Sequence, residues 1–388
     1  MRRHPLRILL AFEPPEGGVQ AHVRRLAGGL VERGHDVDVI TSRDQHMADV
    51  LTELGARVHA LDLVPELANW GANLSAGREM ARVMRERRPD VVHLHDAKAG
   101  VLGRVAAARV RAPAVYSPHS WVYRNQHLRH RRAAILRRGL TLNIERALVP
   151  LTEVILCISE DEAKAARGDL ILGSARLRVV HYGIAPERAE PDRSLLELRA
   201  EGPLFGFMAR LTDQKGLPVL MDALTALGRR GALPRVAIVG SGPEESLVRE
   251  RIARERLHER VAHMPFEPPV WPKLAAFDAL ILPSLWEGLP IGLLEAMASS
   301  LPVVASAVHG IPEAVEDGVT GVLVAPGDPV ALAAAIERLA GDPGLRERMG
   351  AAAHARFEEK FALDRMVNET EGVYREVLSG RADTRSRR

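Results

Sequence analysis

The chain has 388 residues, 46% of them hydrophobic and 27% charged, and this balance excludes a disordered or fibrous protein. Its single cysteine, Cys157, excludes an intramolecular disulfide, and its apolar neighbours predict a buried structural thiol. The net charge of +3 indicates no class of partner, and the length suits two domains.

The N-terminal segment MRRHPLRILLAF is basic, but its apolar run is too short for a signal peptide. No apolar stretch is long enough to span a bilayer. The sequence therefore predicts a cytoplasmic protein that can meet a membrane only from its inner face, as a peripheral protein.

Short apolar runs alternate with helical patterns along the first half of the chain, which predicts repeated βα units and a parallel sheet. The expected strands are Arg7–Phe12, Asp36–Thr41, Arg57–Leu61, Val91–His95, Ala114–Ser117, Val154–Ile158 and Arg178–His181. The expected helices include Val19–Arg33 and Asn73–Arg87. Continuous apolar runs of this kind suit strands that are covered by helices on both faces.

The stretch Ile184–Gly202 is rich in Pro, Glu and Arg and is expected to be a linker, after which the pattern starts again. The expected strands are Leu204–Met208, Arg235–Val239, Val261–Met264, Ala279–Leu282, Val303–Ala305 and Gly321–Val324. The expected helices include Gly216–Gly228, Ile291–Ala298, Val330–Leu339, Gly344–Phe361 and Leu363–Leu378. We therefore expect two doubly wound α/β domains, over residues 1–190 and 191–362, which bind ligands at the carboxyl ends of their strands.

A glycine turn follows the first expected strand, at Gly17 and Gly18. A strand, a glycine turn and then a helix place free backbone N–H groups and the positive end of a helix dipole at the carboxyl edge of the sheet. The turn lacks the full dinucleotide fingerprint, so it indicates either a phosphate or acceptor loop or an ordinary tight turn.

Two cations follow the first strand of the second domain in FMARLTDQKG. The strand delivers Arg210 to its carboxyl end, and Lys215 comes five residues later at a helix start. Two cations there can hold a diphosphate and stabilise its charge as it leaves, although exposed Arg and Lys are commonly only solvated.

Two carboxylates lie in LPSLWEGLPIGLLEAM, where a strand, a short loop and a helix follow one another. Glu287 lies in the loop and Glu295 on the second turn of the helix, whose first turn Pro290 suits. Free N–H groups of the loop can meet phosphate oxygens, and Glu295 can accept hydrogen bonds from sugar or ribose hydroxyls.

Seven residues separate Glu287 from Glu295, and this spacing resembles the E-x7-E motif of the retaining glycosyltransferases of family 4. The segments ARLTDQKGLPVLMDAL, VAIVGSGPEE and SLWEGLPIGLLEAMASSLPVVASAVHGIPEAVEDGVTGVLV resemble the nucleotide-binding domain of that family. The segment GGVQAHVRRLAGGLVERGHDVDVIT resembles its first βα unit. The resemblance covers most of the chain and is strongest over residues 204–340.

The resemblance implies a GT-B fold, in which two Rossmann-like domains face a cleft and no metal or other cofactor is required. It implies that Arg210 and Lys215 hold the donor diphosphate, that Glu287 contacts the transferred sugar and that Glu295 contacts the ribose. Further donor contacts are expected from Gly240, Gly242, Phe266, Leu289, Pro290 and Ile291. The final helix, over residues 363–380, is expected to return to the first domain and to precede a flexible tail over 381–388.

His119 follows a strand of the first domain, in YSPHS, where the family commonly has a histidine near the sugar. Histidines at strand ends are otherwise commonly structural. We expect His119 to stabilise charge or to bind a sugar hydroxyl opposite Glu287. No residue stands out as a nucleophile, which favours front-face attack with retention, the donor phosphate accepting the proton of the acceptor.

Residues 101–150 carry ten arginines and one acid, Glu145, so this segment predicts a basic surface. Trp121 and Tyr123 accompany the charge in residues 121–138, a mixture that suits the headgroups of an anionic membrane as well as it suits a solvated helix. Nucleic acid is not expected as a partner, because no known binding motif accompanies the charge.

The expected reaction is transfer of a sugar from a nucleotide-diphosphate sugar, with UDP and GDP favoured, to a hydroxyl of an acceptor in cell-envelope polysaccharide or glycolipid biosynthesis. Transfer to a small-molecule natural product, a sugar-nucleotide epimerase of the same fold and a non-catalytic nucleotide-sugar-binding protein remain alternatives. The four residues Arg210, Lys215, Glu287 and Glu295 together favour transfer.

Overall fold

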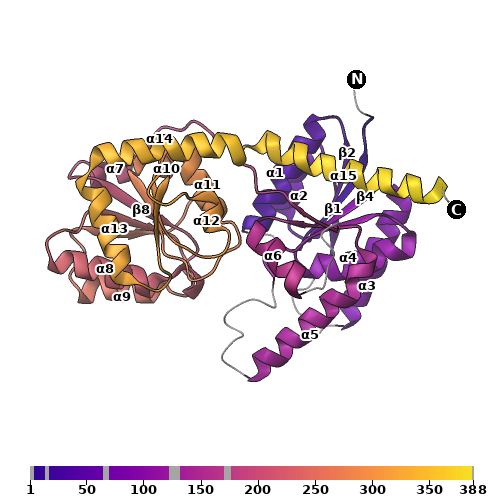
Figure 1. The fold of residues 1–388 in the computed structure, drawn as a ribbon, viewed down its shortest axis with the longest axis horizontal. Coiled ribbons are helices and arrows are strands. Elements are labelled where there is room, and N and C mark those ends of the chain that lie inside the picture. The colour runs from indigo at the N-terminus through magenta and orange to yellow at the C-terminus, as the bar shows by residue number, and fades with distance from the viewer. Residues whose placement is uncertain (1–3, 14–16, 64–69, 122–131, 170–175, 387–388) are drawn as a thin grey trace. The chain divides into compact units, whose positions relative to one another are not determined.

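A computed structural model describes residues 4–13, 17–63, 70–121, 132–169 and 176–386, and the chain divides into two compact units (Figure 1). The first unit comprises Met1–Gly183 and Leu363–Arg388, and the second comprises Ile184–Ala362. The boundary therefore lies before Ile184 and not after residue 190, because Ile184 forms a β-bridge with Ala362 and its N–H donates to the carbonyl of Phe361.

The first unit contains a seven-stranded sheet in the order β3-β2-β1-β4-β5-β6-β7, and the adjacent strands in this order pair in parallel. The strands are β1 (Arg7–Ala11), β2 (Asp36–Ser42), β3 (Arg57–Leu61), β4 (Val91–His95), β5 (Ala114–Ser117), β6 (Val154–Cys157) and β7 (Leu177–Val179). They lie where the apolar runs predict them, except that β7 begins and ends earlier than expected. Cys157 is fully buried, and burial raises the pKa of its thiol.

Helices cover both faces of this sheet, as successive side chains of a strand require. Leu9 joins a core with residues of α3 and α4, while Ile8 and Leu10 join a second core with residues of α1 and α15. The helices are α1 (Gly18–Glu32), α2 (Gln45–Glu53), α3 (Trp70–Arg87), α4 (Ala97–Val110), α5 (Arg132–Leu148), α6 (Glu160–Asp169) and α15 (Leu363–Ser386), with the 3-10 turn η3 (Val149–Leu151).

The second unit contains a six-stranded parallel sheet in the order β10-β9-β8-β11-β12-β13. The strands are β8 (Leu204–Met208), β9 (Arg235–Val239), β10 (Val261–Met264), β11 (Ala279–Leu282), β12 (Val303–Ser306) and β13 (Gly321–Val324). The helices are α7 (Arg193–Arg199), α8 (Leu217–Arg229), α9 (Glu245–Arg254), α10 (Trp271–Ala276), α11 (Ile291–Ala298), α12 (Ile311–Ala314), α13 (Pro329–Gly341) and α14 (Pro343–Lys360), with the 3-10 turn η5 (Asp213–Lys215). The expectation of two doubly wound α/β domains is confirmed.

The expected linker is partly wrong, because it contains α7. The Asp192 side chain caps this helix by accepting from the N–H groups of Ser194 and Leu195. Leu195 is fully buried, and Arg199 forms an ion pair with Asp278. One buried apolar residue and one N-terminal cap therefore stabilise a short helix in a segment whose composition predicts a loop.

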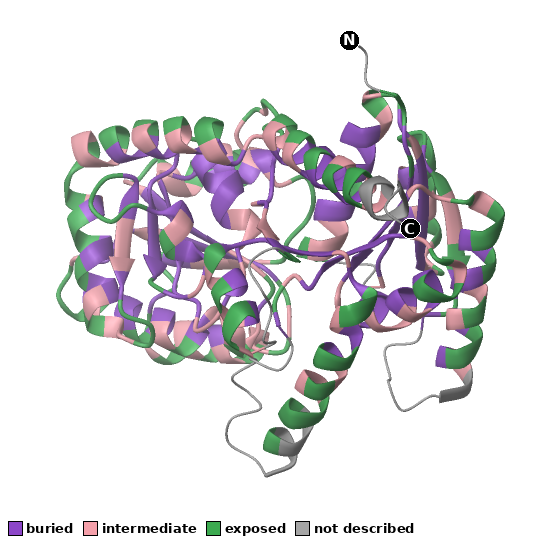
Figure 2. Cartoon of the chain, turned by 45° about the vertical axis from the view of Figure 1, so that its right-hand side comes forward, coloured by how far each residue is buried: buried purple, intermediate pink, exposed green. Residues whose placement is uncertain are grey.

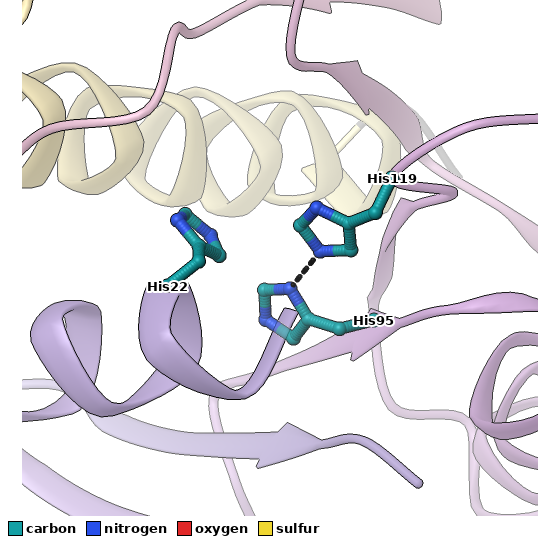
Figure 3. Close-up of side chains that lie close together, drawn as sticks. All are labelled: His22, His95 and His119. Carbon is teal, nitrogen blue, oxygen red and sulfur yellow. Dashed lines mark hydrogen bonds between the residues drawn. The ribbon is translucent and has the colours of Figure 1, made fainter. Parts of the chain in front are cut away.

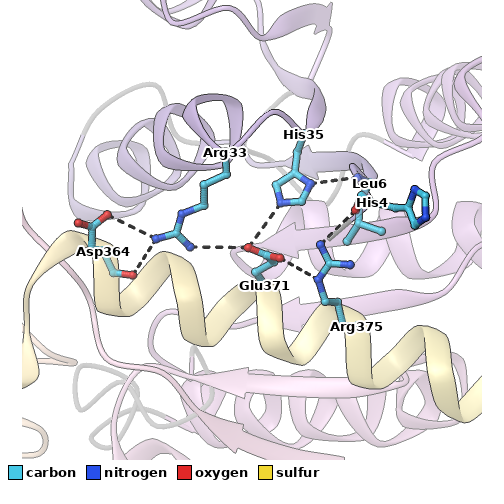
Figure 4. A network of polar contacts seen from close by, with 7 residues as sticks. All are labelled: His4, Leu6, Arg33, His35, Asp364, Glu371 and Arg375. Atoms are coloured by element: carbon cyan, nitrogen blue, oxygen red, sulfur yellow. Dashed lines mark hydrogen bonds and ion pairs between the residues drawn. The ribbon is translucent and has the colours of Figure 1, made fainter. Parts of the chain in front are cut away.

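The last helix, α15, packs on α1 within the first unit and buries Met366, Val367 and Tyr374 in the core there. Glu371, a residue of α15, lies at the centre of a polar network between this helix and the segment that carries Arg33 and His35 (Figure 4). Its carboxylate forms ion pairs with Arg375 at 2.7 Å and with Arg33 at 3.7 Å, and Nε2 of His35 lies 3.6 Å from it.

The expected flexible tail over residues 381–388 is wrong for most of its length, because α15 continues to Ser386. Arg381 explains the continuation: its guanidinium forms an ion pair with Glu153 at 2.6 Å and donates to the carbonyl of Arg111. Residues 387–388 lie outside the described part of the chain.

Figure 2 shows the central strands of both sheets as largely buried and much of α5 as exposed. The edge strands β3, β7, β10 and β13 are only partly buried. Ile135 and Leu140 of α5 are 65% and 63% exposed. In the described residues, none of the helices combines the length and the apolar composition that crossing a bilayer needs.

Candidate active site

The second sheet places its two most informative motifs side by side. Strands β8 and β11 are neighbours at the centre of the sheet, where the strand order reverses. Ligands of doubly wound domains bind beyond the carboxyl ends of the strands at such a point. The segment that carries Arg210 and Lys215 follows β8, and the loop that carries Glu287 follows β11.

The side chains of Lys215 and Glu287 form an ion pair, with 2.5 Å between Nζ and Oε1. Both are largely buried, since the side chain of Lys215 is 17% exposed and that of Glu287 is 6% exposed. The Ser284 hydroxyl donates to the same carboxylate oxygen at 2.8 Å, and the Gln214 amide donates to the other at 3.3 Å. The carboxylate is thus held in one orientation by a cation and two neutral donors.

Backbone contacts join the same two loops. The N–H of Leu285 donates to the carbonyl of Gln214 at 2.8 Å, and the Gln214 amide donates to the carbonyl of Trp286 at 3.0 Å. The N–H of Glu287 donates to Nδ1 of His309, which lies beyond β12. Rigid positioning of this kind is what a site needs to hold a substrate at a fixed distance from a charged group.

Two glycines allow the loops to approach this closely. Gly216 has a φ of +66°, and a Cβ on it would lie 2.0 Å from the carbonyl oxygen of Pro283. Gly242, after β9, has a φ of +155°, and a Cβ on it would lie 2.4 Å from the carbonyl oxygen of Leu211. Any side chain at either position would push the neighbouring loops apart.

The start of α11 lies just after the Glu287 loop. Leu289 is buried, Pro290 is the N-cap and Ile291 is the first helical residue. N–H groups in the first turn of a helix have no partner within the helix, so they can meet phosphate oxygens there. Glu295 is 9% exposed and lies one turn further along, as the sequence predicts.

The other predicted donor residues lie around the same edge of the second sheet. Arg210 is exposed after β8, and Gly240 directly follows β9, where its carbonyl hydrogen-bonds to Nε2 of His263. Phe266 follows β10 and is 44% exposed, with the ammonium of Lys273 5.8 Å from the centre of its ring.

In the first unit, His119 lies in the turn after β5 and has a φ of +56°. Its Nδ1 shares a hydrogen bond of 2.7 Å with the hydroxyl of Tyr182, and its Nε2 shares one of 2.8 Å with Nδ1 of His95. Burial is the main reason that the pKa of His119 lies well below its ordinary value, so the imidazole is neutral at pH 7.

The glycine turn lies at the start of α1, where Gly17 and Gly18 are exposed and Gly17 is the N-cap. Nearby, the N–H of Glu13 donates to the carboxylate of Asp96, which caps α4. This is the switch point of the first sheet, between β1 and β4.

Sequence reasoning missed several members of these groups: Gln214, Ser284, His309, His22, His95 and Tyr182. Gln214, Ser284, His309 and His22 lie within the segments quoted above, and of these Gln214 and Ser284 are also close along the chain to Lys215 and Glu287. The contacts of His309, His22, His95 and Tyr182 depend on the order of the strands, which spacing along the chain does not reveal.

Comparisons with known proteins agree with this geometry. Residues 202–342 match the family model described as glycosyl transferases group 1, and residues 16–188 match that of glycosyltransferase family 4. A D-inositol 3-phosphate glycosyltransferase of Acidothermus cellulolyticus is 31% identical, over 96% of this chain and 88% of the relative. The protein belongs to the family 4 glycosyltransferases. It is therefore an enzyme, and its nucleotide sugar is a substrate.

Other relatives of this glycosyltransferase are named for different activities. An alpha-D-kanosaminyltransferase of Streptomyces kanamyceticus is 30% identical, over 60% of this chain and 63% of the relative. Among solved structures, Anabaena HepE in complex with UDP superimposes with a TM-score of 0.80 at 22% identity, over 96% of this chain and all of HepE. WaaG, a glycosyltransferase of lipopolysaccharide biosynthesis, does so with a TM-score of 0.72 at 18% identity, over 95% of this chain and 99% of WaaG. The GT-B fold is thus confirmed.

Proposed function

We propose that this glycosyltransferase transfers a sugar with retention of anomeric configuration, from a UDP- or GDP-sugar to a hydroxyl of a cell-envelope polysaccharide or glycolipid. The observation that carries the proposal is the buried pair of Lys215 and Glu287 at the switch point of the second sheet. A cation and a carboxylate held together there supply one group for a diphosphate and one for a sugar.

In this proposal Lys215 and Arg210 neutralise the diphosphate as it leaves. The backbone N–H groups of Leu289, of Ile291 and of the first turn of α11 add to this stabilisation. Glu287 contacts the transferred sugar, and Glu295 accepts from the ribose hydroxyls. Gly240, Gly242 and Phe266 shape the donor pocket. These interactions strengthen as negative charge grows on the leaving group, so they act on the transition state.

The step that we propose is front-face attack, without a metal ion. The bond between the anomeric carbon and the phosphate oxygen breaks, the acceptor oxygen bonds to the same face of that carbon, and the acceptor proton passes to a phosphate oxygen. Glu287 is a poor nucleophile, because Lys215 and Ser284 already engage its carboxylate. His119 binds a sugar hydroxyl or stabilises charge, and Gly17 and Gly18 offer N–H groups to the acceptor. A trapped glycosyl-enzyme adduct would contradict this mechanism.

The activities named for the relatives support transfer but not one acceptor. One relative is a D-inositol 3-phosphate glycosyltransferase and another transfers kanosaminyl groups. An Erwinia amylovora relative that is 35% identical over 217 residues, half of this chain and 53% of the relative, serves amylovoran biosynthesis. Envelope acceptors are favoured here by the exposed Arg138, Ile135 and Leu140 of α5, which suit an anionic membrane surface.

The structure narrows the basic surface that the sequence predicts. Trp121 is buried and its indole N–H donates to the carbonyl of Glu162, so it does not face headgroups. Arg104 is fully buried and paired with Glu145 at 2.8 Å, so its charge is not on the surface. Residues 122–131, including Tyr123, lie outside the described part of the chain.

The deciding experiment incubates the protein with UDP-, GDP- and ADP-sugars and follows both melting temperature and product. Stabilisation by one donor that Lys215→Ala and Glu295→Ala both weaken supports the proposed pocket. With a suitable acceptor, a transfer product with the donor's anomeric configuration is expected. An epimerised donor or an unchanged bound donor would instead favour the alternatives, and an inverted product would refute retention.

A further inference from the structure

Three histidines gather in the first unit at the carboxyl edge of its sheet (Figure 3). His22 comes from α1, His95 is the last residue of β4, and His119 lies in the turn after β5. Their ring centres are 5.0 Å, 5.1 Å and 5.4 Å apart, so the three imidazoles surround a common point at nearly equal distances. One nitrogen from each ring lies within 4.8 Å of the other two.

Two of these rings have nitrogens that the protein leaves unsatisfied. Nδ1 of His22 and Nε2 of His95 are buried and have no hydrogen-bond partner among the described residues. His22 is 7% exposed and His95 is fully buried. Buried polar atoms are normally paired, so the orphaned Nδ1 of His22 can accept a ligand, whereas His95 meets His119 through its other nitrogen, Nδ1.

The position of His119 is fixed by a second contact. A partner on the far nitrogen commonly orients a metal-bound histidine, and the hydroxyl of Tyr182 occupies that position on His119.

His93, a near neighbour, shows the contrast. Its ring centre is 3.9 Å from that of His95, but its two nitrogens are hydrogen-bonded to the hydroxyls of Tyr374 and Ser117, at 2.7 Å and 2.9 Å. Both of its nitrogens are thus bonded to residues outside the cluster. His119 differs, because its Nε2 is bonded only to Nδ1 of His95, another member of the cluster, and an ion between the two rings can replace that bond.

We infer that His22, His95 and His119 form a binding site for a divalent transition-metal ion of the Zn²⁺ class. Three imidazoles leave the fourth tetrahedral position for water, and the ligand nitrogens need to lie roughly 3.3 Å apart, as metal–nitrogen distances of about 2.0–2.1 Å require. The 2.8 Å contact between His95 and His119 would therefore open slightly.

The three histidines belong to the first unit, whereas the ion pair of Lys215 and Glu287 belongs to the second. Zn²⁺ binding is measured without donor or acceptor, so the inference does not depend on the proposed function. An ion there would tie together α1, β4 and the turn after β5. It would also engage Nε2 of His119, the residue to which the proposed function gives contact with the sugar. Bound Zn²⁺ would therefore stabilise the protein without serving transfer.

The test titrates ZnCl₂ into full-length, chelator-treated protein by calorimetry and repeats the melting curve with the metal. One Zn²⁺ per chain and a raised melting temperature are expected, with no response to MgCl₂, since Mg²⁺ prefers oxygen ligands. His22→Gln should weaken Zn²⁺ binding at least about tenfold, and Tyr182→Phe should do so by about 10- to 100-fold. The exposed His46 of α2 provides the control, and His46→Gln should bind as the wild type does.

Wild-type protein that fails to bind Zn²⁺ would overturn the inference, as would His22→Gln protein that binds it with unchanged affinity. If His22→Gln does not fold, the Tyr182→Phe protein decides in the same way. A visible spectrum of the Co²⁺-loaded wild type gives an independent reading, because the proposed ligands predict four-coordinate cobalt and octahedral cobalt would contradict them.

Discussion

The substitution Gly216→Ala tests whether close contact between two loops builds the donor site. Gly216 separates Lys215 from α8 and lies against the carbonyl of Pro283, which precedes the Glu287 loop. Gly231 provides a matched control in the same unit, because it has a similar φ, +69° against +66°, but a Cβ on it would meet no atom within 4 Å.

The left-handed backbone costs alanine about 1–2 kcal/mol at either position. In a unit of this size that lowers the melting temperature by roughly 2–8 °C. Only Gly216→Ala also places a Cβ 2.0 Å from a carbonyl oxygen, where ordinary contact begins at 3.4 Å. Relief requires the loops to separate by about 1.4 Å, and a displacement of about 1 Å at a reacting group can cost 10²-fold in rate.

The assay measures melting temperature and donor affinity for the wild type and both variants. Gly231→Ala is expected to lose stability and to keep donor affinity. Gly216→Ala is expected to lose more stability and to bind donor about 10- to 150-fold more weakly, because displacement of Lys215 costs a charged hydrogen bond of about 1.5–3 kcal/mol. Equal losses of stability and unchanged donor affinity in the two variants would refute the reasoning.

Three further predictions concern single contacts. Lys215→Met should raise the donor Kd roughly 10- to 150-fold, the equivalent of about 1.5–3 kcal/mol for a charged hydrogen bond. Arg230→Met, which removes an exposed partner of Glu337, should leave the donor Kd unchanged. If both substitutions change the donor Kd equally, Lys215 does not bind the diphosphate. In α1, Gly29→Ala should destabilise by about 1–3 kcal/mol, because its Cβ would lie 2.6 Å from Val367 of α15. Gly28→Ala, whose Cβ would lie 3.5 Å from Leu54, should be neutral or stabilising by up to about 1 kcal/mol, and thermal melts that rank the two variants in reverse would contradict this packing. His35 accepts from the N–H of Leu6, and burial is the main cause of its lowered pKa. The unfolded chain therefore takes up a proton on this residue first, near the ordinary value of 6.5, so stability that is present above pH 6.5 is lost as the pH falls. Melts between about pH 7 and pH 5 should show a smaller loss for His35→Gln than for the wild type, and equal slopes would rule the contribution out.

The sequence by itself determined the architecture of this protein and indicated the residues of the proposed donor site. The strand β8 and the helix α11 begin and end where apolar runs and turn residues predict, because each buried strand needs continuous apolar side chains and each turn needs Gly, Pro or a cap. The spacing of Glu287 and Glu295 indicated the family, because local spacing along one loop and one helix survives in the linear chain.

Only the tertiary structure decided which distant residues meet. The strand order brings the loop after β11 next to the segment after β8, so Glu287 meets Lys215 across 72 positions of sequence. The cluster of His22, His95 and His119 could not be predicted from the sequence for the same reason, because its members come from three different segments. Burial also reversed two expectations drawn from composition, since Arg104 and Trp121 lie in the interior. Composition reports charge and hydrophobicity, whereas partners and burial follow from how the chain folds back on itself.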